Sequence, residues 1–267
     1  METKGIDVSK WQGDINFKKV KSSGIDFVII REGYGRKDPN QIDKKFKENY
    51  QKAKEAGLNV GVYHYSYADS AEDAINEARF CLENISGMQF EYPIVFDIED
   101  KEQQKLSNRQ RTDIVKAFCN EIEANGYYAM FYCNLNWINH YLCRDELLEK
   151  YDFWLANWYA NSPVVPCGIW QYSSEGKIDG IFGNVDLDIS YKNYPEIMRN
   201  KGLNGFSKAN NSANTNYFTY TVKKGDTLWA IAQKFLGDGT KWGQIKKANN
   251  LSSTVIYPNQ ILKIPRQ

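Results

Sequence analysis

The clearest absence in this 267-residue sequence is a long hydrophobic run. No stretch of eighteen apolar residues occurs, so the chain is not expected to insert into a membrane. The N-terminus, Met1 to Gly5, also lacks the apolar segment of an export signal. We therefore expect a soluble protein that is made in the cytoplasm without a signal peptide of its own.

Cysteine and histidine are scarce, and neither has the spacing of metal ligands. The cysteines are odd in number and scattered, so we interpret them as reduced thiols that mostly pack, not as a disulfide framework. They are Cys81, Cys119, Cys133, Cys143 and Cys167. His64 and His140 are the only histidines, which disfavours a His-rich zinc site. No Ser-His-Asp pattern occurs either, and the sequence implies no metal and no cofactor.

The formal net charge of +1 hides a division along the chain. Residues 217–267 hold eight basic and two acidic side chains, a balance of +6, whereas the other 216 residues hold 26 basic and 31 acidic ones, a balance of −5. A basic tail suits nucleic acid, an anionic bacterial wall, or simply solvent. Because no base-reading motif occurs, we do not predict nucleic-acid binding.

Acidic residues end the most apolar stretch of the chain. Tyr92 to Phe96 is typical of a buried central strand, and Asp97, Glu99 and Asp100 follow it. Side chains two apart on a strand share a face, so Asp97 and Glu99 are expected to project together and Asp100 the other way. Adjacent carboxylates repel, which raises one pKa until that group holds a proton near neutrality. A proton donor beside a fixed negative charge is what cleavage of a glycosidic bond requires.

Helices and short hydrophobic strands alternate over the first 150 residues. A glycine joins helix to strand at Gly24, Gly57 and Gly126, a rhythm typical of a parallel α/β fold. Beyond residue 150 the strand patterns follow one another too closely for full helices. Strands are predicted at residues 3–8, 25–31, 58–65, 92–99, 127–133, 153–158, 168–172 and 184–189. We predict a modified TIM-like (β/α) barrel whose last three strands lack full helices, with chemistry at the C-terminal strand ends.

Composition divides the chain into a large domain, a linker and a small module. Residues 203–218 are polar, small and aperiodic, which predicts a flexible linker after a domain of residues 1–202. Residues 219–267 show two strand patterns around two helix patterns, a compact β-α-α-β module. Such a module is small for independent stability, so exposed apolar surface on it should be limited or purposeful.

Five motifs, in order along the chain, resemble glycoside hydrolase family 25, the lysozymes of bacteria, fungi and phages. They are Asp7-x-Ser-x-Trp-Gln-Gly, Tyr63-His64-Tyr65, Phe96-Asp97-Ile98-Glu99, Trp170-Gln171-Tyr172 and Val185-Asp186-Leu187, within a resemblance over residues 3–195. The resemblance implies a barrel with five helix-bearing and three nearly helix-free strands. It also implies that Glu99 is the catalytic acid, with Asp97 beside it and Asp7 and Asp186 as supporting acids.

The roles of these acids stay open at this point. Asp97 either attacks the anomeric carbon or orients the substrate's own 2-acetamido group while that group attacks. Asp7 and Asp186 either tune the pair and hold sugar or water, or make only structural hydrogen bonds at the barrel rim. Family members usually have Asn where this chain has Asp188. That acid either raises the pKa of the catalytic acid further or faces solvent at the strand end.

Aromatic residues near the predicted strand ends are expected either to stack on sugar faces or to pack the barrel. They are Tyr63, Tyr65, Tyr132, Trp154, Trp158 and Trp170. We interpret His64 as a packed or hydrogen-bonded barrel residue and not as a base, because no carboxylate motif surrounds it.

Residues 219–265 resemble a LysM module, a binder of N-acetylglucosamine-containing chains such as peptidoglycan and chitin. The segments Tyr220 to Trp229 and Tyr257 to Pro265 carry the resemblance. By family analogy, sugar lies between two loops that contain Gly225, Asp226, Thr227, Leu228, Ile256, Tyr257 and Pro258. A wall-cutting domain tethered to a wall-binding module is typical of phage endolysins, which are stored in the host cytoplasm, and the tether raises the effective substrate concentration.

The sequence therefore predicts an N-acetylmuramidase that cleaves the β-1,4 bond between N-acetylmuramic acid and N-acetylglucosamine in bacterial peptidoglycan. The predicted partner is the wall glycan, with no nucleic acid and no membrane insertion. Three alternatives stay open: a chitinase-like glycosidase, a bacterial autolysin, and a wall-binding protein with a degenerate barrel. The presence of Asp7, Asp97, Glu99 and Asp186 together argues against the last.

Overall fold

The computed structural model describes residues 2–36, 38–158, 160–207, 217–258 and 260–265. The chain divides into two compact units, residues 1–208 and 209–267, and each is described by itself. Among the described helices, none is both long and apolar enough to cross a membrane. All five cysteines are free thiols, and three of them are buried, in agreement with their interpretation as packing residues.

The first unit is built on a closed barrel of eight strands in sequence order, which confirms the predicted architecture. Neighbouring strands run parallel from the first to the seventh, whereas the eighth is antiparallel to both of its neighbours. The strands are β1 (Thr3–Val8), β2 (Phe27–Tyr34), β3 (Asn59–Tyr65), β4 (Ile94–Asp97), β5 (Ala129–Asn134), β6 (Asp152–Ala156), β7 (Ile169–Gly176) and β8 (Val185–Ser190).

The reversed direction of β8 follows from chain length. Residues 177–184 are too few for a parallel crossover, so β7 and β8 form a hairpin. Gln171 pairs with Asp188 low on this hairpin and Gly176 with Val185 at its tip. The hairpin therefore continues beyond the level at which Gln171 sits.

Helices separate the early strands, as the glycine rhythm predicts. They are α1 (Phe17–Ser22), α2 (Phe46–Glu55), α3 (Ala71–Ile85), α4 (Asn108–Ala124), the short α5 (Leu135–His140) and α6 (Arg144–Lys150), and α7 (Tyr194–Lys201) after the last barrel strand. Three 3-10 turns, η1 (Lys10–Gln12), η2 (Pro39–Gln41) and η3 (Lys101–Lys105), follow β1, β2 and β4. In the described residues between β6 and β8 no helix forms. Gly57 and Gly126 have φ of 76° and 81°, the left-handed conformation that ends a helix cheaply only at glycine.

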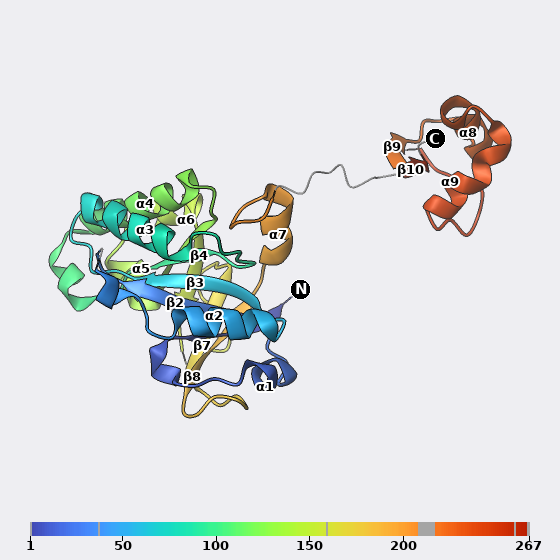
Figure 1. Cartoon of the computed structure of the whole chain (residues 1–267). Helices are drawn as coiled ribbons and strands as arrows, with labels where there is room; N and C mark the ends of the chain where they lie inside the picture. Colours follow the sequence, from blue (N-terminus) through green and yellow to red (C-terminus); the bar gives the residue numbers. More distant parts are fainter. Residues whose placement is uncertain (1, 37, 159, 208–216, 259, 266–267) are drawn as a thin grey trace. The chain divides into compact units, whose positions relative to one another are not determined.

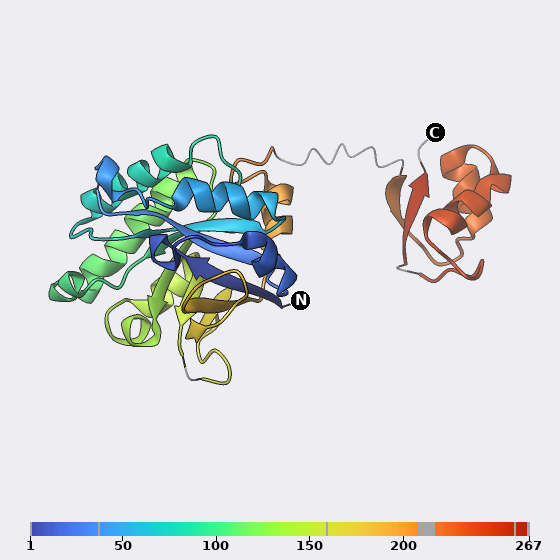
Figure 2. The same cartoon turned by 60° about the horizontal axis from the view of Figure 1, so that its bottom comes forward.

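Both faces of the barrel sheet are buried. Outward-facing strand residues pack against α2, α3 and α4, which cover the outside of the barrel (Figures 1 and 2), and Phe96 meets Phe118 there at 4.4 Å between ring centroids. Inside the barrel Phe27 stacks on Tyr92 at 4.2 Å. Tyr194 of α7 packs against Tyr92, just before β4, at 5.3 Å. Helix α7 therefore closes the end of the barrel at which the parallel strands begin.

The chain continues to pack against the barrel beyond Gly202, where the sequence predicts the linker to begin. Asn204 is fully buried, with Oδ1 accepting the Tyr128 N–H at 2.7 Å and Nδ2 donating to the Tyr92 carbonyl at 2.8 Å. Polar composition indicated a linker, but here the amide satisfies backbone groups beside the barrel. Residues 208–216 of the predicted linker lie outside the described residues.

The second unit has the predicted β-α-α-β order. It consists of β9 (Tyr217–Thr221), α8 (Leu228–Leu236), η4 (Gly239–Lys241), α9 (Trp242–Ala248) and β10 (Ile261–Pro265), with β9 and β10 antiparallel. Its own small core includes Val222, Ile231, Ile245 and Leu262. The helices thus cover one face of a two-stranded sheet.

Candidate active site

A cavity of about 530 Å³ opens at the carboxyl ends of the parallel strands. Each barrel strand contributes to its lining: Asp7 from β1, Arg31 from β2, Tyr63 and Tyr65 from β3, Asp97 from β4, Tyr132 and Asn134 from β5, Trp154 and Ala156 from β6, Gln171 from β7 and Asp186 from β8. Glu99, two residues beyond β4, lines it as well. The four acids predicted from the sequence therefore meet in one place.

Asp7 and Asp186 face each other across the β1–β8 pair. Burial raises the pKa of Asp7 well above its ordinary value, and the charges of Asp186 and Asp188 raise it further. A hydrogen bond from Gln171 Nε2 to Asp7 Oδ2, at 2.7 Å, opposes this rise. Burial also raises the pKa of Asp186 to about 6.

Asp97 is buried and Glu99 is half-buried. Burial raises the pKa of Asp97 well above its ordinary value, the Glu99 charge raises it further, and the Arg31 guanidinium lowers it. Burial raises the pKa of Glu99 as well, against a hydrogen bond with the Asn134 side chain. Asn134 Oδ1 already accepts the Trp137 N–H at 3.1 Å as the cap of α5, so Nδ2 is the atom that donates to Glu99.

Carboxyl groups this close titrate as a set. Because all four pKa values are raised, the cavity retains protons at a pH where isolated carboxyls are ionised. The site therefore offers a proton donor together with negative charge. Asp100 does not line the cavity: it accepts the Tyr65 hydroxyl at 3.2 Å and the Glu102 N–H at 2.9 Å, and its charge adds to the rise in the pKa values of Asp97 and Glu99.

Aromatic side chains form much of the cavity wall, among them the predicted Tyr63, Tyr65, Tyr132 and Trp158. Trp158 is 42% exposed, and its Nε1 donates to Gln171 Oε1 at 3.0 Å. Trp170 lies elsewhere: its ring packs outward near Tyr172 and its Nε1 donates to the Asn157 carbonyl at 3.1 Å. Successive residues of a strand face opposite sides, so Gln171 points inward and Trp170 outward. The prediction that Trp170 contacts sugar is corrected accordingly.

Asp188 does not face solvent, which overturns one of the two expectations for it. The side chain is fully buried, Oδ1 accepts the Trp154 N–H at 2.9 Å, and Oδ2 has no donor among the described residues. Its carboxyl lies against that of Asp7. Burial raises the pKa of Asp188 well above its ordinary value, and its charge in turn raises the pKa of Asp7. Asp188 thus raises the pKa of its direct neighbour Asp7.

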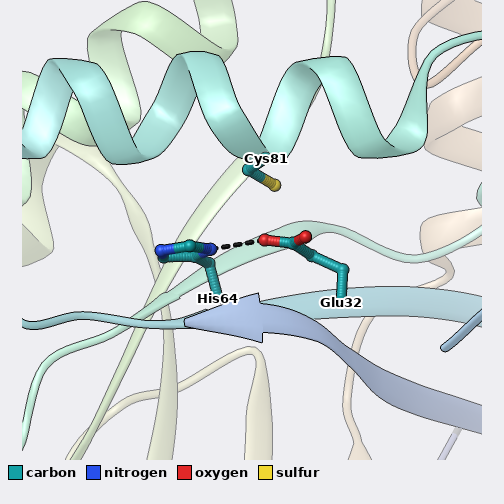
Figure 3. A group of neighbouring side chains, drawn as sticks. All are labelled: Glu32, His64 and Cys81. Carbon is teal, nitrogen blue, oxygen red and sulfur yellow. Dashed lines mark hydrogen bonds and ion pairs between the residues drawn. The ribbon is translucent and has the colours of Figure 1, made fainter. Parts of the chain in front are cut away.

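Glu32, His64 and Cys81 form a buried group on the outer side of the sheet, below α3 (Figure 3). His64 Nδ1 is hydrogen-bonded to Glu32, and Nε2 donates to the Gly35 carbonyl at 3.0 Å. Burial lowers the pKa of His64, but the Glu32 and Glu77 carboxylates raise it by more. Within the described chain these three side chains are the one set spaced for a metal. Both ring nitrogens of His64 are engaged in hydrogen bonds, to Glu32 and to Gly35, so His64 is a packed and hydrogen-bonded residue, as predicted.

Seven residues of the second unit are expected to bind sugar, and three of them have structural roles while the other four lie at the surface. Leu228 is buried in the core, and that prediction is corrected, because the first apolar position of α8 faces inward. Asp226 holds the preceding turn by accepting the Lys223 N–H at 2.7 Å, and Thr227 caps α8. Exposed or half-buried are Gly225, Ile256, Tyr257 and Pro258, of which Tyr257 is 68% exposed.

Sequence reasoning gave no role to three residues that hold the acids. Gln171 binds Asp7, Asn134 binds Glu99, and Arg31 faces Asp97. Gln171 stands in the motif Trp170-Gln171-Tyr172, and the other two stand at the ends of predicted strands. Their position alone was therefore a usable signal.

The fold and the site together define a carbohydrate-cleaving type of barrel, with a carboxyl-rich, aromatic-walled cavity at the C-terminal strand ends. Residues 6–181 match the sequence profile of Glycosyl hydrolases family 25, and the chain belongs to this family. Residues 220–265 match the profile of the LysM domain.

Similar proteins support the same assignment. The chain is 32% identical to Lysozyme M1 of Streptomyces globisporus over 199 residues, which is 68% of this chain and 65% of that protein. It is 30% identical to the Autolytic lysozyme of Clostridium acetobutylicum over 187 residues, 69% of this chain and 55% of that one. The match thus spans less than two thirds of both relatives. Among solved structures, the CTP1L endolysin is similar with a TM-score of 0.64 and 26% identity, covering 75% of this chain and 70% of that one.

Because Asp188 is buried, we expect it to make the stability of the protein depend on pH, and we expect the substitution Asp188→Asn to remove this dependence. Its pKa is raised in the folded chain, so the folded chain binds the proton more tightly, and the free energy of unfolding falls as pH rises from the unfolded pKa toward the folded one. In Asp188→Asn the amide keeps an oxygen for Trp154 and offers an N–H to Asp7. We expect this variant to exceed the wild type by about 1 to 3 kcal/mol near neutral pH, the cost of a buried unpaired group, measured by urea unfolding.

The advantage of Asp188→Asn should shrink as pH falls toward the ordinary carboxyl pKa, because the wild-type acid is then protonated in both states. Glu175→Gln, an exposed acid of β7, is the matched control and should leave the pH dependence unchanged. Equal stability of Asp188→Asn and wild type at every pH would show that Asp188 carries no raised pKa.

Proposed function

We propose that the protein is an N-acetylmuramidase that hydrolyses the β-1,4 bond between N-acetylmuramic acid and N-acetylglucosamine in bacterial peptidoglycan. The proposal rests on the family, on relatives named lysozymes, and on the set of protonatable carboxyl groups in one aromatic-walled cavity. No cofactor takes part in it.

Glu99 is the proposed proton donor. It is half-buried, so its carboxyl reaches both the cavity and the solvent that must later supply water. Its raised pKa keeps a proton available, and the hydrogen bond with Asn134 fixes its direction. In the first step its proton goes to the glycosidic oxygen as the bond from that oxygen to the anomeric carbon breaks.

Asp97 is proposed to hold the substrate's 2-acetamido group. Asp97 lines the cavity together with Glu99, and its carboxylate is the proposed acceptor for the acetamido N–H. This bond turns the acetamido carbonyl oxygen toward the anomeric carbon, where it forms the new bond as the leaving oxygen departs. Water then opens the cyclic intermediate and gives its proton to the Glu99 carboxylate. Direct attack of Asp97 on the anomeric carbon is the alternative course.

The C-terminal unit is proposed to bind the N-acetylglucosamine of the same wall through the loops around Gly225 and Tyr257. Endolysins combine a domain that cuts the wall with one that binds it, and we propose that this protein is an endolysin. A bacterial autolysin is the second candidate, favoured by the similarity to the Autolytic lysozyme. Two other cavities, one beside Tyr50 and one beside Tyr151, are each lined by fewer acidic residues than the four of the candidate active site.

Glu99→Gln should abolish wall lysis, because the amide has no proton to give to the leaving oxygen. We expect a loss of at least about a hundredfold in rate, the usual contribution of a general acid, in a turbidity assay on Gram-positive walls. Glu102→Gln, an exposed acid three residues on, is the matched control. Mass spectrometry of wild-type products should find muramic acid at the reducing ends; N-acetylglucosamine ends would instead support the chitinase-like alternative.

Asp97→Asn should slow the reaction. The wild-type enzyme should give a product that retains the anomeric configuration of the substrate. Retention follows because two successive displacements occur at the same carbon when the acetamido group attacks first. Proton NMR of the first-formed anomer, recorded before mutarotation, measures it. A product of inverted configuration would exclude both the acetamido mechanism and direct attack by Asp97.

Tyr257→Ala should weaken binding to sedimented walls without changing the rate on soluble oligosaccharides. The tyrosine ring is exposed in one of the two loops, and loss of a stacking contact costs about 1 kcal/mol, roughly fivefold in affinity. Tyr217→Ala, a 40% exposed tyrosine on β9, is the control. Unchanged wall binding by Tyr257→Ala would remove this loop from the binding site.

A further inference from the structure

A second hollow lies beside the catalytic cavity. It has a volume of about 300 Å³ and is lined by Lys10, Trp11, Arg31, Tyr34, Tyr65 and Tyr67. Arg31 and Tyr65 also line the catalytic cavity, so the two spaces share a wall. A substrate bound across the catalytic acids can therefore extend a branch into the second hollow.

The second hollow differs from the catalytic cavity in charge. Its cations are Lys10 and Arg31, and no carboxylate lines it, whereas four carboxyl groups line the cavity. Asp43 accepts two hydrogen bonds from Arg31, at 2.9 and 2.7 Å from Nε and Nη2, and so balances that charge. Within the described ranges the Lys10 ammonium makes no ion pair and lies 4.8 Å from the centre of the Trp11 ring. Lys10 therefore supplies the net positive charge.

The hollow is also a fixed aromatic surface. Trp11 is 76% exposed and Tyr67 is 47% exposed, unusual values for residues that are mostly buried in folded proteins. The 3-10 turn that carries Trp11 is held by the Ser9–Gln12 capping box, and the Lys10 N–H donates to Asp43 at 3.1 Å. The surface is thus built in place next to the acids, although it buries little of its own area.

We propose that this hollow binds the acidic peptide substituent of the muramoyl residue that is cut in the catalytic cavity. The inference rests on the proposed muramidase function and names a part of its substrate. A peptide carboxylate pairs with Lys10, and the methyl and methylene groups of the peptide lie on Trp11 and Tyr67. The negative charge that remains on the acids of the catalytic cavity repels the same carboxylate, so charge directs the peptide to the second hollow and the uncharged sugar rings to the first.

The test compares two soluble glycans from the same wall, one with its stem peptides and one stripped of them by an amidase and then amidated at the lactyl carboxyl groups that the amidase frees. For Lys10→Met and Trp11→Ala we expect KM on the peptide-bearing glycan to rise about three- to tenfold, the loss typical of one charge-assisted hydrogen bond or one aromatic contact. On the stripped glycan KM and kcat should equal those of the wild type, because neither residue lines the catalytic cavity.

Lys18→Met and Phe182→Ala are the matched controls, an exposed lysine on α1 and a 96% exposed aromatic outside both spaces. Circular dichroism should show all four variants folded. An equal rise in KM on both glycans would mean that the hollow holds sugar, and no rise on either would mean that it holds nothing; each result overturns the inference alone. A wild type that cuts neither glycan overturns the proposed function as well.

Discussion

Several carboxyl groups lie close together at one mouth of the barrel and repel one another. The rest of the first unit must be stable enough to hold them there. Asp7, Asp97, Glu99 and Asp186 line one cavity, and Asp188 lies buried behind Asp7. Such a group cannot be fully ionised without a large electrostatic cost, so it keeps protons and, with them, an acid that can act near neutrality. Stability has to come from elsewhere, and the two buried faces of the sheet provide it.

Alternation along a single strand separates catalytic from structural polar groups. On β3, Tyr63 and Tyr65 line the cavity, whereas His64 between them faces α3 and binds Glu32. The same alternation on β7 places Gln171 among the acids and Trp170 outside. Side chains that neighbour one another in the sequence therefore serve different surroundings, and a motif of adjacent residues is not a single site.

This alternation also explains which features the sequence could predict. The acids stand at the ends of apolar strands, and the barrel brings strand ends together, so their meeting followed from local pattern and topology. The burial of Asp188, the packing of Asn204 and the direction of β8 depend on long-range pairing: Trp154 and Asp7 for the first, Tyr92 and Tyr128 for the second, and the short hairpin connection for the third. Neither composition nor periodicity encodes those partners. Gln171 and Asn134 were missed because amides gain their role only from the carboxyl they hold.

The β7–β8 hairpin gives this barrel a wall of a different kind from the others. Most sides of the mouth end in connections that lead into helices, and those helices pack against the rest of the sheet. The hairpin instead rises past Gln171 as a two-stranded ribbon. Its tip touches the start of α1, where the Asn16 N–H donates to the Gly180 carbonyl at 2.8 Å and Lys19 pairs with Asp179 at 3.2 Å. The barrel closes through the pairing of β1 with residues 186–190 of β8, so a change in the length of the tip would alter its contact with α1 and leave barrel closure intact. This one rim of the mouth can therefore be lengthened or trimmed to suit differently cross-linked polymers while the acids stay in place.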